Sequence, residues 1–387
     1  MKNYLPVFRL PLYVALIVPV MICMASCRKI ATSEVLSSSS VANSKVLEAG
    51  EPTLEAGYFH SFILKPDSTL WATGWNYYGQ LGDGTNTNKS IPAFIADSVI
   101  AIASSFQHSL IIRSDNTLWA TGYNEHGELG DGTNSNKNTF VPIMNNVKAI
   151  ATGFYHSLIL KTDNTLWATG LNEDGELGDG SFTNRNTPVF ITDNVKAIEA
   201  GTFHSLILKT DNTLWANGYN AFGGLGDGTN TSRNRPVKIW PDIKAVSGGH
   251  YHSLILRTDN SLYVTGGNFY GEFGNGTVWG TNRPIYDNIT DGKAISASYY
   301  YSLILRTDNT LWSTGFNAYG QLGDGTNTNR IFPVKVMDSV KTISAGGYHS
   351  IILKADGSIW TTGYNAYGQL GDGTTQGRNS WTKMLLP

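Results

Sequence analysis

Short apolar runs bounded by turn residues recur along nearly the whole chain after residue 50. One example, Ser157-Leu158-Ile159-Leu160, is apolar at three consecutive positions. Consecutive residues of a strand face opposite sides of a sheet, so both faces of such a strand must be buried, as between stacked sheets. No helical spacing of apolar residues of adequate length appears after residue 27, and the pattern therefore predicts an all-β fold.

The pattern repeats at intervals of 48 or 49 residues. A His-Ser pair marks each unit, and a tyrosine replaces the histidine once: His60, His108, His156, His204, His252, Tyr301 and His349. Every unit holds four segments typical of short strands, which resemble Pro-Val-x-Ile, Val-Lys-Ala-Ile, Ser-Leu-Ile-Leu-Lys and Thr-Leu-Trp-Ala-Thr. Seven such units predict a seven-bladed β-propeller with four-stranded blades, occupying residues 46–387.

We expect the C-terminal strand to close this ring. The first unit has no complete strand matching residues 333–336 ahead of Leu54, and the chain ends with an apolar segment at residues 381–386. A last strand that completes the first blade would hide two sheet edges. We therefore predict that the ring is closed by the C-terminal strand completing the first blade.

Two turns recur with small polar residues. The hairpin between the Ser-Leu-Ile-Leu and Leu-Trp strands is Asp-Asn in five units, Asp67-Ser68 in the first and Asp356-Gly357 in the last. Asn and Gly both tolerate a positive φ, which predicts that conformation here. The motif Gly-Asp-Gly recurs six times, followed by Thr in five units and by Ser181 in the third, with Asn275 replacing its Asp in the fifth unit. We expect this Asp to cap its own turn, because calcium needs several converging oxygen ligands.

The N-terminus is typical of an export signal. Lys2 and Arg9 precede an uncharged run from residue 10 to residue 26, which ends in Met24-Ala25-Ser26-Cys27. A basic start, an apolar stretch and small residues before a cysteine resemble a bacterial lipoprotein signal, so we expect residues 1–27 to be a lipoprotein-type signal peptide and Cys27 to be the lipid-attachment residue. Residues 28–45 are Ser-rich and predict a flexible tether. A plain signal peptide or a membrane anchor remains an alternative.

The charge and the cysteine content limit the classes of partner and the cellular location that fit this chain. The formal charge is −2 and only 15% of residues are charged, so the surface has no electrostatic reason to bind nucleic acid. Both cysteines, Cys23 and Cys27, lie in the N-terminal segment, and a fold without thiols suits an oxidising location. We expect an exported protein of the bacterial cell envelope or extracellular space, monomeric and without a cofactor.

The repeat Gly-x-x-His-Ser-Leu-x-Leu, followed by Asp-Asn/Gly-Thr-Leu-Trp-x-x-Gly-x-Asn-x-x-Gly-x-Leu-Gly-Asp-Gly-Thr, resembles the regulator of chromosome condensation repeat over residues 51–387. The resemblance implies a seven-bladed propeller. It does not imply the activities of the eukaryotic member, which is a nucleotide exchange factor for a small GTPase and docks on chromatin through a basic tail and inserted loops, since fold alone does not carry function. A secreted bacterial member of the family inhibits a β-lactamase with one face of its propeller.

Residues that differ between repeats are the best candidates for binding. The His-Ser pairs are expected to be structural, because adjacent strand residues point to opposite faces and cannot form a catalytic dyad. Aromatic residues near blade ends should instead form circular belts, where they can anchor a protein or stack on sugars. The candidates for partner binding are Trp75, Tyr123, His126, Tyr155, Phe203, Tyr251, Phe269, Tyr270, Trp279, Tyr299 and Tyr300.

Three classes of function remain open. A non-catalytic scaffold that binds a protein, including an enzyme inhibitor, fits the aromatic face. A glycan-binding module fits the same belts. An enzyme has the weakest basis, because Glu125, Glu173 and Asp174 form the one polar arc that departs from the repeat, and no catalytic or metal site is expected.

Overall fold

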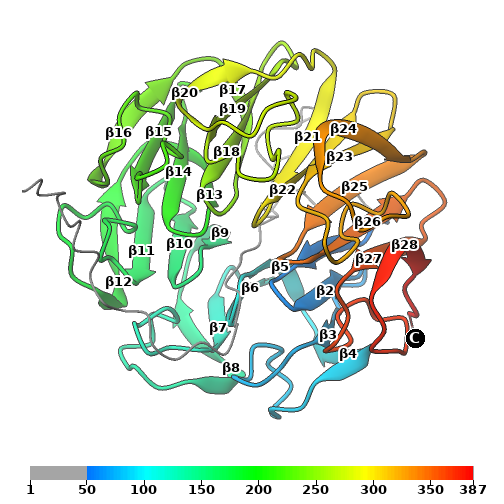
Figure 1. Cartoon of the computed structure of the whole chain (residues 1–387). Helices are drawn as coiled ribbons and strands as arrows, with labels where there is room; N and C mark the ends of the chain where they lie inside the picture. The colour runs from blue at the N-terminus through cyan, green and yellow to red at the C-terminus, as the bar shows by residue number, and fades with distance from the viewer. Residues whose placement is uncertain (1–49, 387) are drawn as a thin grey trace, which may run out of the picture.

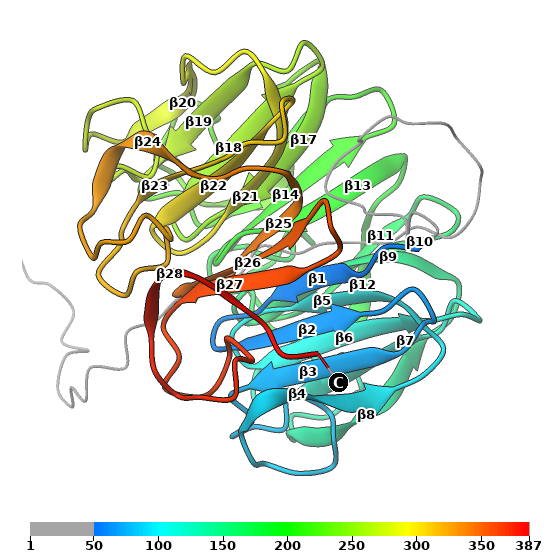
Figure 2. The same ribbon diagram turned by 90° about the vertical axis from the view of Figure 1, so that its right-hand side faces the viewer.

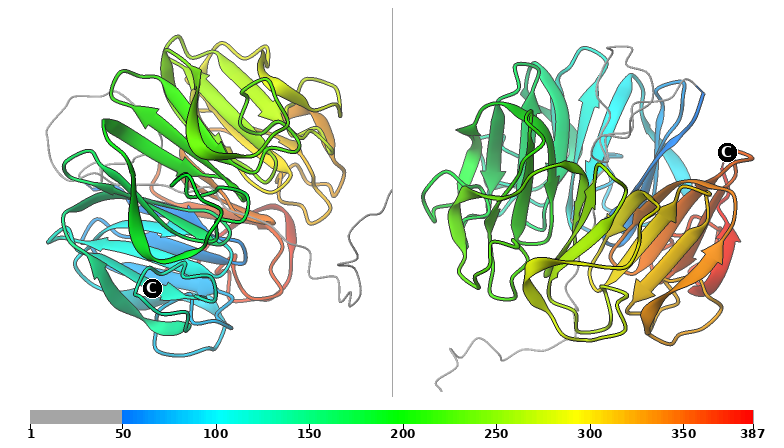
Figure 3. Two further views of the ribbon diagram at one scale, coloured as in Figure 1. Left: turned by 90° about the vertical axis from the view of Figure 1, so that its left-hand side faces the viewer. Right: turned by 90° about the horizontal axis from the view of Figure 1, so that it is seen from above.

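The computed structural model describes residues 50–386, which form seven four-stranded antiparallel sheets arranged round a ring (Figure 1). Helices are absent from these residues. Neighbouring sheets stand face to face, as the side and top views show (Figures 2 and 3). The predicted all-β, seven-bladed propeller is confirmed. None of residues 50–386 forms a helix long and apolar enough to cross a membrane.

The innermost strands of the blades contact one another round the ring. Their Val-Lys-Ala-Ile segments are buried except at the lysine position, as in β13, where only Lys196 reaches the surface. The inner strands are β1 (Thr53–Ala56), β5 (Val99–Ser104), β9 (Val147–Thr152), β13 (Val195–Ala200), β17 (Ile243–Gly248), β21 (Gly292–Ala297) and β25 (Val340–Ala345).

The second strands carry the Ser-Leu-Ile-Leu segments and are buried on both faces, as the consecutive apolar residues predict. Stacked sheets on each side supply this apolar environment. The second strands are β2 (His60–Leu64), β6 (His108–Arg113), β10 (His156–Lys161), β14 (His204–Lys209), β18 (His252–Arg257), β22 (Tyr301–Arg306) and β26 (His349–Lys354).

The third strands follow the Asp-Asn hairpins. The second hairpin residue has the predicted positive φ, for example 62° at Asn116 and 80° at Gly357, and Asp115 Oδ1 accepts the Thr117 amide at 3.0 Å. The third strands are β3 (Leu70–Gly74), β7 (Leu118–Gly122), β11 (Leu166–Gly170), β15 (Leu214–Gly218), β19 (Leu262–Gly266), β23 (Leu311–Gly315) and β27 (Ile359–Gly363).

The outer strands are half-exposed and contain proline in the first six blades. Proline lacks an amide hydrogen and so discourages pairing with another chain at an open sheet edge. The outer strands are β4 (Lys89–Ala96), β8 (Lys137–Met144), β12 (Arg185–Thr192), β16 (Arg233–Trp240), β20 (Thr281–Tyr286), β24 (Arg330–Met337) and β28 (Arg378–Lys383).

The predicted closure by the C-terminal strand is wrong. Strand β28 pairs with β27 in the seventh blade, and blade 1 has its own outer strand, β4. The Pro-Val-x-Ile segment is the last strand of the preceding blade rather than the first strand of the next, so blade 1 lacks nothing. The ring closes through side-by-side packing of β1 against β25 and β26, where the Ala56 amide donates to Ser344 Oγ at 3.0 Å.

Candidate functional site

One end of the ring carries all the long loops. Antiparallel strands alternate in direction, so the turn after each inner strand and the loop after each third strand meet at the same end. In blade 1 the Trp75 amide donates to the Phe59 carbonyl at 2.8 Å, and the two rings lie 5.8 Å apart. We call this end the loop face.

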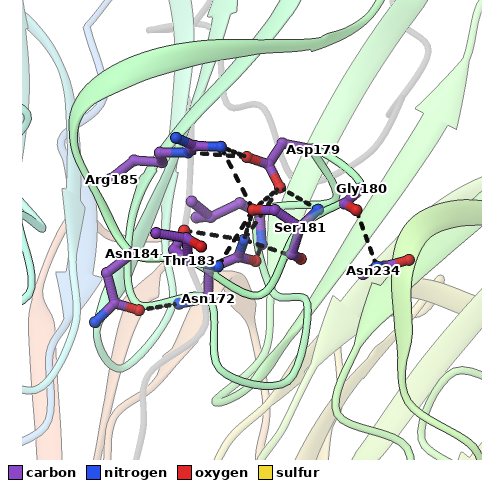
Figure 4. Close-up of polar contacts among 9 residues, drawn as sticks. Asn172, Asp179, Gly180, Ser181, Thr183, Asn184, Arg185 and Asn234 are labelled. Carbon is purple, nitrogen blue, oxygen red and sulfur yellow. Dashed lines mark hydrogen bonds and ion pairs between the residues drawn. The ribbon is translucent and has the colours of Figure 1, made fainter.

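Each long loop is built round one buried asparagine, shown for blade 3 in Figure 4. Asn172 Nδ2 donates to Asp179 Oδ1 at 3.1 Å, and its Oδ1 accepts the Leu177 amide at 3.0 Å. Asp179 Oδ1 also accepts the Ser181 amide, while Oδ2 pairs with Arg185 at 2.7 Å. Burial alone would raise the pKa of Asp179, but its bonds to Ser181 and Arg185 outweigh burial and lower it.

The recurrent Asp is therefore a structural cap, as predicted. The same ion pair forms in six blades: Asp83–Lys89, Asp131–Lys137, Asp179–Arg185, Asp227–Arg233, Asp324–Arg330 and Asp372–Arg378. In the fifth blade both partners change together, to Asn275 and Thr281. Within residues 50–386, no group of three or more His, Cys, Asp or Glu residues is placed to hold a metal ion.

The His-Ser pairs form a polar ring between blades rather than catalytic dyads. His108 Nε2 lies 2.9 Å from Ser157 Oγ of the next blade, and Ser157 Oγ donates to the Glu128 carbonyl at 2.8 Å. Since the hydroxyl proton is used on the carbonyl, the histidine must donate from Nε2 and is neutral. The ring closes from His349 to Ser61 at 2.8 Å, and Tyr301 makes the equivalent contact with Ser350 at 3.0 Å.

Burial holds these ring histidines in the neutral form. It lowers the pKa of His60, His108 and His156 to about 3, with smaller contributions from neighbouring histidines at His60 and His156. Gly153 shows how tightly the imidazoles pack, because a Cβ there would collide with the His156 ring. A protonation switch near neutral pH and a nucleophile-base pair are both incompatible with this environment.

A second repeated position places carboxyl or amide groups beneath the loop face. Glu128 Oε2 accepts the His126 amide at 3.0 Å and Glu176 Oε2 accepts the Asp174 amide at 2.9 Å, while Gln80 makes the same bond in blade 1. Burial raises the pKa of Glu128 to about 8 and of Glu176 to about 7. A protonated glutamic acid resembles glutamine, which explains why both residues occur at this position.

Aromatic side chains on the loop face form a buried centre and a surrounding belt. The centre contains Tyr58, Phe106, Phe154, Tyr299 and Tyr348, each less than a tenth exposed. The belt runs without interruption round the face through ring contacts of 4.2–6.4 Å. Its circuit uses Phe154 of the centre to link Tyr155 to Phe203, and its own members are Trp75, Tyr78, Tyr123, Tyr155, Phe203, Tyr219, Tyr251, Phe269, Tyr300, Phe316, Tyr319, Tyr364 and Tyr367.

The eleven predicted partner-binding residues all lie on this loop face, but they differ in access. Tyr299 is 8% exposed and Tyr123 is 9% exposed, so packing within the face occupies them and they cannot anchor a partner directly. Phe269 and Trp279 are exposed, at 46% and 79%. The remaining seven are half-buried and present a ring edge: Trp75, His126, Tyr155, Phe203, Tyr251, Tyr270 and Tyr300. Cys27 lies outside the described residues.

Sequence reasoning missed two exposed apolar residues that lie against the loop carrying Trp279. Ile331 and Phe332, at the start of β24, are 39% and 61% exposed. The Gly276 amide donates to the Ile331 carbonyl at 2.8 Å, and a Cβ on Gly276 would collide with the Phe332 ring, so both lie against the loop of blade 5. The exposed apolar residues of the blade 5 loop and of the adjoining start of β24 are together called the 5/6 patch below: Phe269, Val278, Trp279, Ile331 and Phe332.

The 5/6 patch replaces a polar contact found at other blade boundaries. Asn138 Nδ2 donates to Asn86 Oδ1 between blades 1 and 2 at 3.3 Å, and three further boundaries repeat this bond: Asn186 to Asn134, Asn282 to Asn230, and Asn379 to Asn327. Val278 and Ile331 occupy these two positions at the 5/6 boundary. Comparison of the outer-strand starts could have revealed Ile331, since asparagine stands there in five repeats.

The acidic arc lies on blades 2 and 3. Glu125 Oε2 accepts the Tyr123 hydroxyl at 2.9 Å, and Asp174 Oδ1 lies 3.4 Å from Ser232 Oγ of the next blade. Burial, and then the charge of Glu173, raises the pKa of Asp174, although the Ser232 bond partly offsets this. Glu125 and Asp174 thus bond to neighbouring loop residues.

The sequence matches a family model described as RCC1-like domain over residues 33–293. Models of the regulator of chromosome condensation (RCC1) repeat match residues 293–321, 340–369 and 308–353. None of the curated proteins compared with the chain matches its sequence.

Solved structures with the same fold include yeast RCC1 (Prp20) bound to Kap60, with 19% identity, a TM-score of 0.74, and coverage of 92% of this chain and 89% of that chain. Prp20p from Saccharomyces cerevisiae, described with its binding to Gsp1p and histones, has 19% identity, a TM-score of 0.74 and coverage of 90% and 91%. Human WBSCR16 has 17% identity, a TM-score of 0.69 and coverage of 86% and 98%. At these identities the likeness concerns the fold.

Proposed function

The chain belongs to the RCC1-like domain family, and from this premise we propose that it is a non-catalytic scaffold that binds another protein through the 5/6 patch of its loop face. Yeast RCC1 (Prp20), which has the same fold, has been crystallised with Kap60, and Prp20p is described with binding to Gsp1p and histones. We propose protein binding for this chain as well, with a partner of its own.

The clustering of apolar replacements at one boundary carries this proposal. Trp279 occupies the position of Thr87 and Thr231 in other loops, and Phe332 occupies that of Thr139. Exposing several large apolar side chains at one blade boundary is unfavourable in water, and exposed apolar patches usually mark interaction sites. Tryptophan is also among the residues most enriched at the energetic centres of protein interfaces.

Blade 5 and its boundary with blade 6 lack two polar contacts that support the propeller elsewhere. The boundary lacks the Asn–Asn hydrogen bond, and Asn275 and Thr281 replace the ion pair of the other blades. Each such contact contributes on the order of 0.5–1.5 kcal/mol. The loss of the hydrogen bond and the ion pair does not help blade 5 to fold, and neither does the gain of exposed apolar surface. These replacements therefore favour a role in binding a partner.

The polar groups of the chain support a binding role rather than catalysis. The ring histidines donate to serines, and the loop aspartates are bonded on both oxygens, as Asp179 illustrates. A catalytic constellation needs a base or nucleophile that can reach a substrate. We also propose that Cys27 carries a lipid and that the chain is exported to the cell envelope, as its N-terminal sequence suggests.

Site-specific photo-crosslinking in intact cells tests the proposed surface. A photoreactive phenylalanine analogue at position 279 of the full-length chain should yield a discrete adduct with another protein. The same analogue at position 231, the equivalent exposed site on blade 4, should not.

The adduct should also disappear when the neighbouring patch is made polar by Ile331→Asn and Phe332→Thr, the residues found at these positions in blade 2. Equal adducts at positions 279 and 231, no adduct at either position, or an adduct that persists in the polar double variant would each contradict the proposal.

A further inference from the structure

A cavity of about 450 Å³ opens on the loop face between blades 6 and 7. The loop of blade 6 contributes Ala318, Tyr319 and Asn327, and blade 7 contributes Tyr364 and the start of β28 with Gly377, Arg378, Asn379 and Ser380. Its volume falls within the range of about 300–1,000 Å³ typical of small-molecule sites. The cavity is separate from the 5/6 patch.

An equivalent but smaller cavity between blades 2 and 3 explains how this one arises. That cavity measures about 280 Å³ and is lined by Asn184 at the position of Gly377. Asn184 Oδ1 accepts the Asn172 amide at 2.8 Å (Figure 4), and Asn88, Asn136 and Asn329 cap their loops in the same way. Gly377 removes this side chain and widens the space.

Glycine at position 377 also removes the side-chain cap of the blade 7 loop. Asn365 is the blade 7 equivalent of Asn172, and it is fully buried. Its amide has no acceptor among residues 50–386, and the missing acceptor is the side-chain oxygen that an asparagine at position 377 would supply. A buried amide without a partner costs stability, so glycine at position 377 gives up stability while it leaves space in the cavity.

The lining selects a neutral, hydroxyl-rich ligand. Tyr319 and Tyr364 form an aromatic corner, with ring centres 5.2 Å apart and planes inclined by 72°. Arg378 donates through Nε and Nη2 to Asp372, so its charge is already balanced and the cavity does not favour an anion. The lining contains no carboxylate to attract a cation, because Ala318 stands where blade 2 has Glu125.

We infer that the cavity between blades 6 and 7 is a binding site for a neutral saccharide. The C–H face of a pyranose ring packs on an aromatic corner of this kind, while its hydroxyls bond to amides and a guanidinium. Asn379 Nδ2 lines the cavity and donates one hydrogen to Asn327 at 3.1 Å, so its second hydrogen is available for a ligand oxygen.

Saturation-transfer NMR with the full-length chain and a panel of neutral sugars tests this site. The panel contains glucose, galactose, mannose, N-acetylglucosamine, maltose and cellobiose, and inorganic phosphate serves as an anionic probe. We expect binding of at least one neutral sugar and none of phosphate. Binding of no neutral sugar, or of phosphate instead, would overturn the inference.

Gly377→Asn is the decisive variant, because it fills the cavity and caps Asn365 as four other blades already do. A Cβ at Gly377 would approach the Gly363 carbonyl at 3.3 Å, which requires only a small shift. The variant should retain its thermal stability and bind the sugar at least tenfold more weakly. Ser232→Asn, the matched change in blade 4, should leave sugar binding unchanged, as should Trp279→Ala. Wild-type affinity in Gly377→Asn would refute the site.

Discussion

Replacing Glu128 by Gln changes one buried side chain into a form that the chain already uses elsewhere. Gln80, Gln321 and Gln369 occupy the same position and accept the same backbone amide. Glu128 is fully buried, and one of its carboxyl oxygens has no partner among the described residues. If this glutamate is protonated in the folded chain, the substitution should preserve the fold and remove a pH-dependent cost.

The sign of that cost follows from the pKa of Glu128, which burial raises from 4.5 to about 8. The unfolded chain releases this proton at lower pH than the folded chain. Stabilisation from the group is therefore complete below pH 4.5 and is lost as the pH rises through 8. Between pH 6 and pH 9 the loss amounts to about 2–3 kcal/mol, at about 1.4 kcal/mol for each pH step over which only the unfolded carboxyl is ionised.

Urea unfolding followed by tryptophan fluorescence at pH 6 and pH 9 measures this difference. Glu128→Gln should be more stable than the wild type, and its advantage should grow by about 2–3 kcal/mol between the two pH values. Glu173→Gln, a change of the same type at an exposed site on blade 3, should show no such growth. An advantage that is constant with pH, or a variant less stable at pH 9, would refute the assignment of a buried neutral carboxyl.

Further predictions concern the stability of the propeller and the N-terminal segment. Burial lowers the pKa of the six ring histidines to about 3–4. The stability that these neutral histidines contribute is therefore complete above pH 6.5 and is lost as the pH falls towards 4, at about 8 kcal/mol per pH step for six residues. Circular dichroism should detect cooperative unfolding between pH 6 and 4.5, and a folded chain at pH 4 would contradict this prediction. Asn275→Asp with Thr281→Arg should restore the loop ion pair and add about 0.5–1 kcal/mol in thermal unfolding, whereas no gain at low salt would show that blade 5 cannot form it. Gly170→Ala should cost at least about 2 kcal/mol, since φ is 107° and a Cβ would collide with the Tyr155 carbonyl; a neutral effect would contradict this backbone. Incorporation of labelled fatty acid should be lost in Cys27→Ala, and persistent label would exclude that anchor.

The repeat made most of the frame predictable. The same residues recur every 48 or 49 positions, which predicted the number of blades. Consecutive apolar residues such as Leu158 and Ile159 predicted strands buried on both faces. Turn conformations followed from residue type, as at Asn116, because few side chains tolerate positive φ. The structural role of His156 followed from strand geometry alone.

The sequence did not determine where each blade begins, because a repeat can be cut at any point without changing its spacing. We therefore misassigned the strand that closes the ring. Residues 333–336 belong to the outer strand of blade 6, so blade 1 has no missing strand for the C-terminus to supply. The solvent exposure of single side chains was not predictable either. Tyr299 and Tyr300 are neighbours in the sequence, yet only Tyr300 reaches the surface. Ile331 escaped notice because its contact with the blade 5 loop, through the Gly276 amide, crosses a blade boundary, and equivalence between repeats does not itself indicate which positions meet.

The most direct test of the proposed function restores the 5/6 boundary to the pattern of the other blades. The variant combines Val278→Asn, Trp279→Thr, Ile331→Asn and Phe332→Thr. Its affinity for the protein that crosslinks at position 279 should fall at least 100-fold, as expected when a central tryptophan and its neighbours are lost, while its melting temperature stays equal or rises. Unchanged affinity in this folded variant would contradict the claim that the 5/6 patch binds the partner.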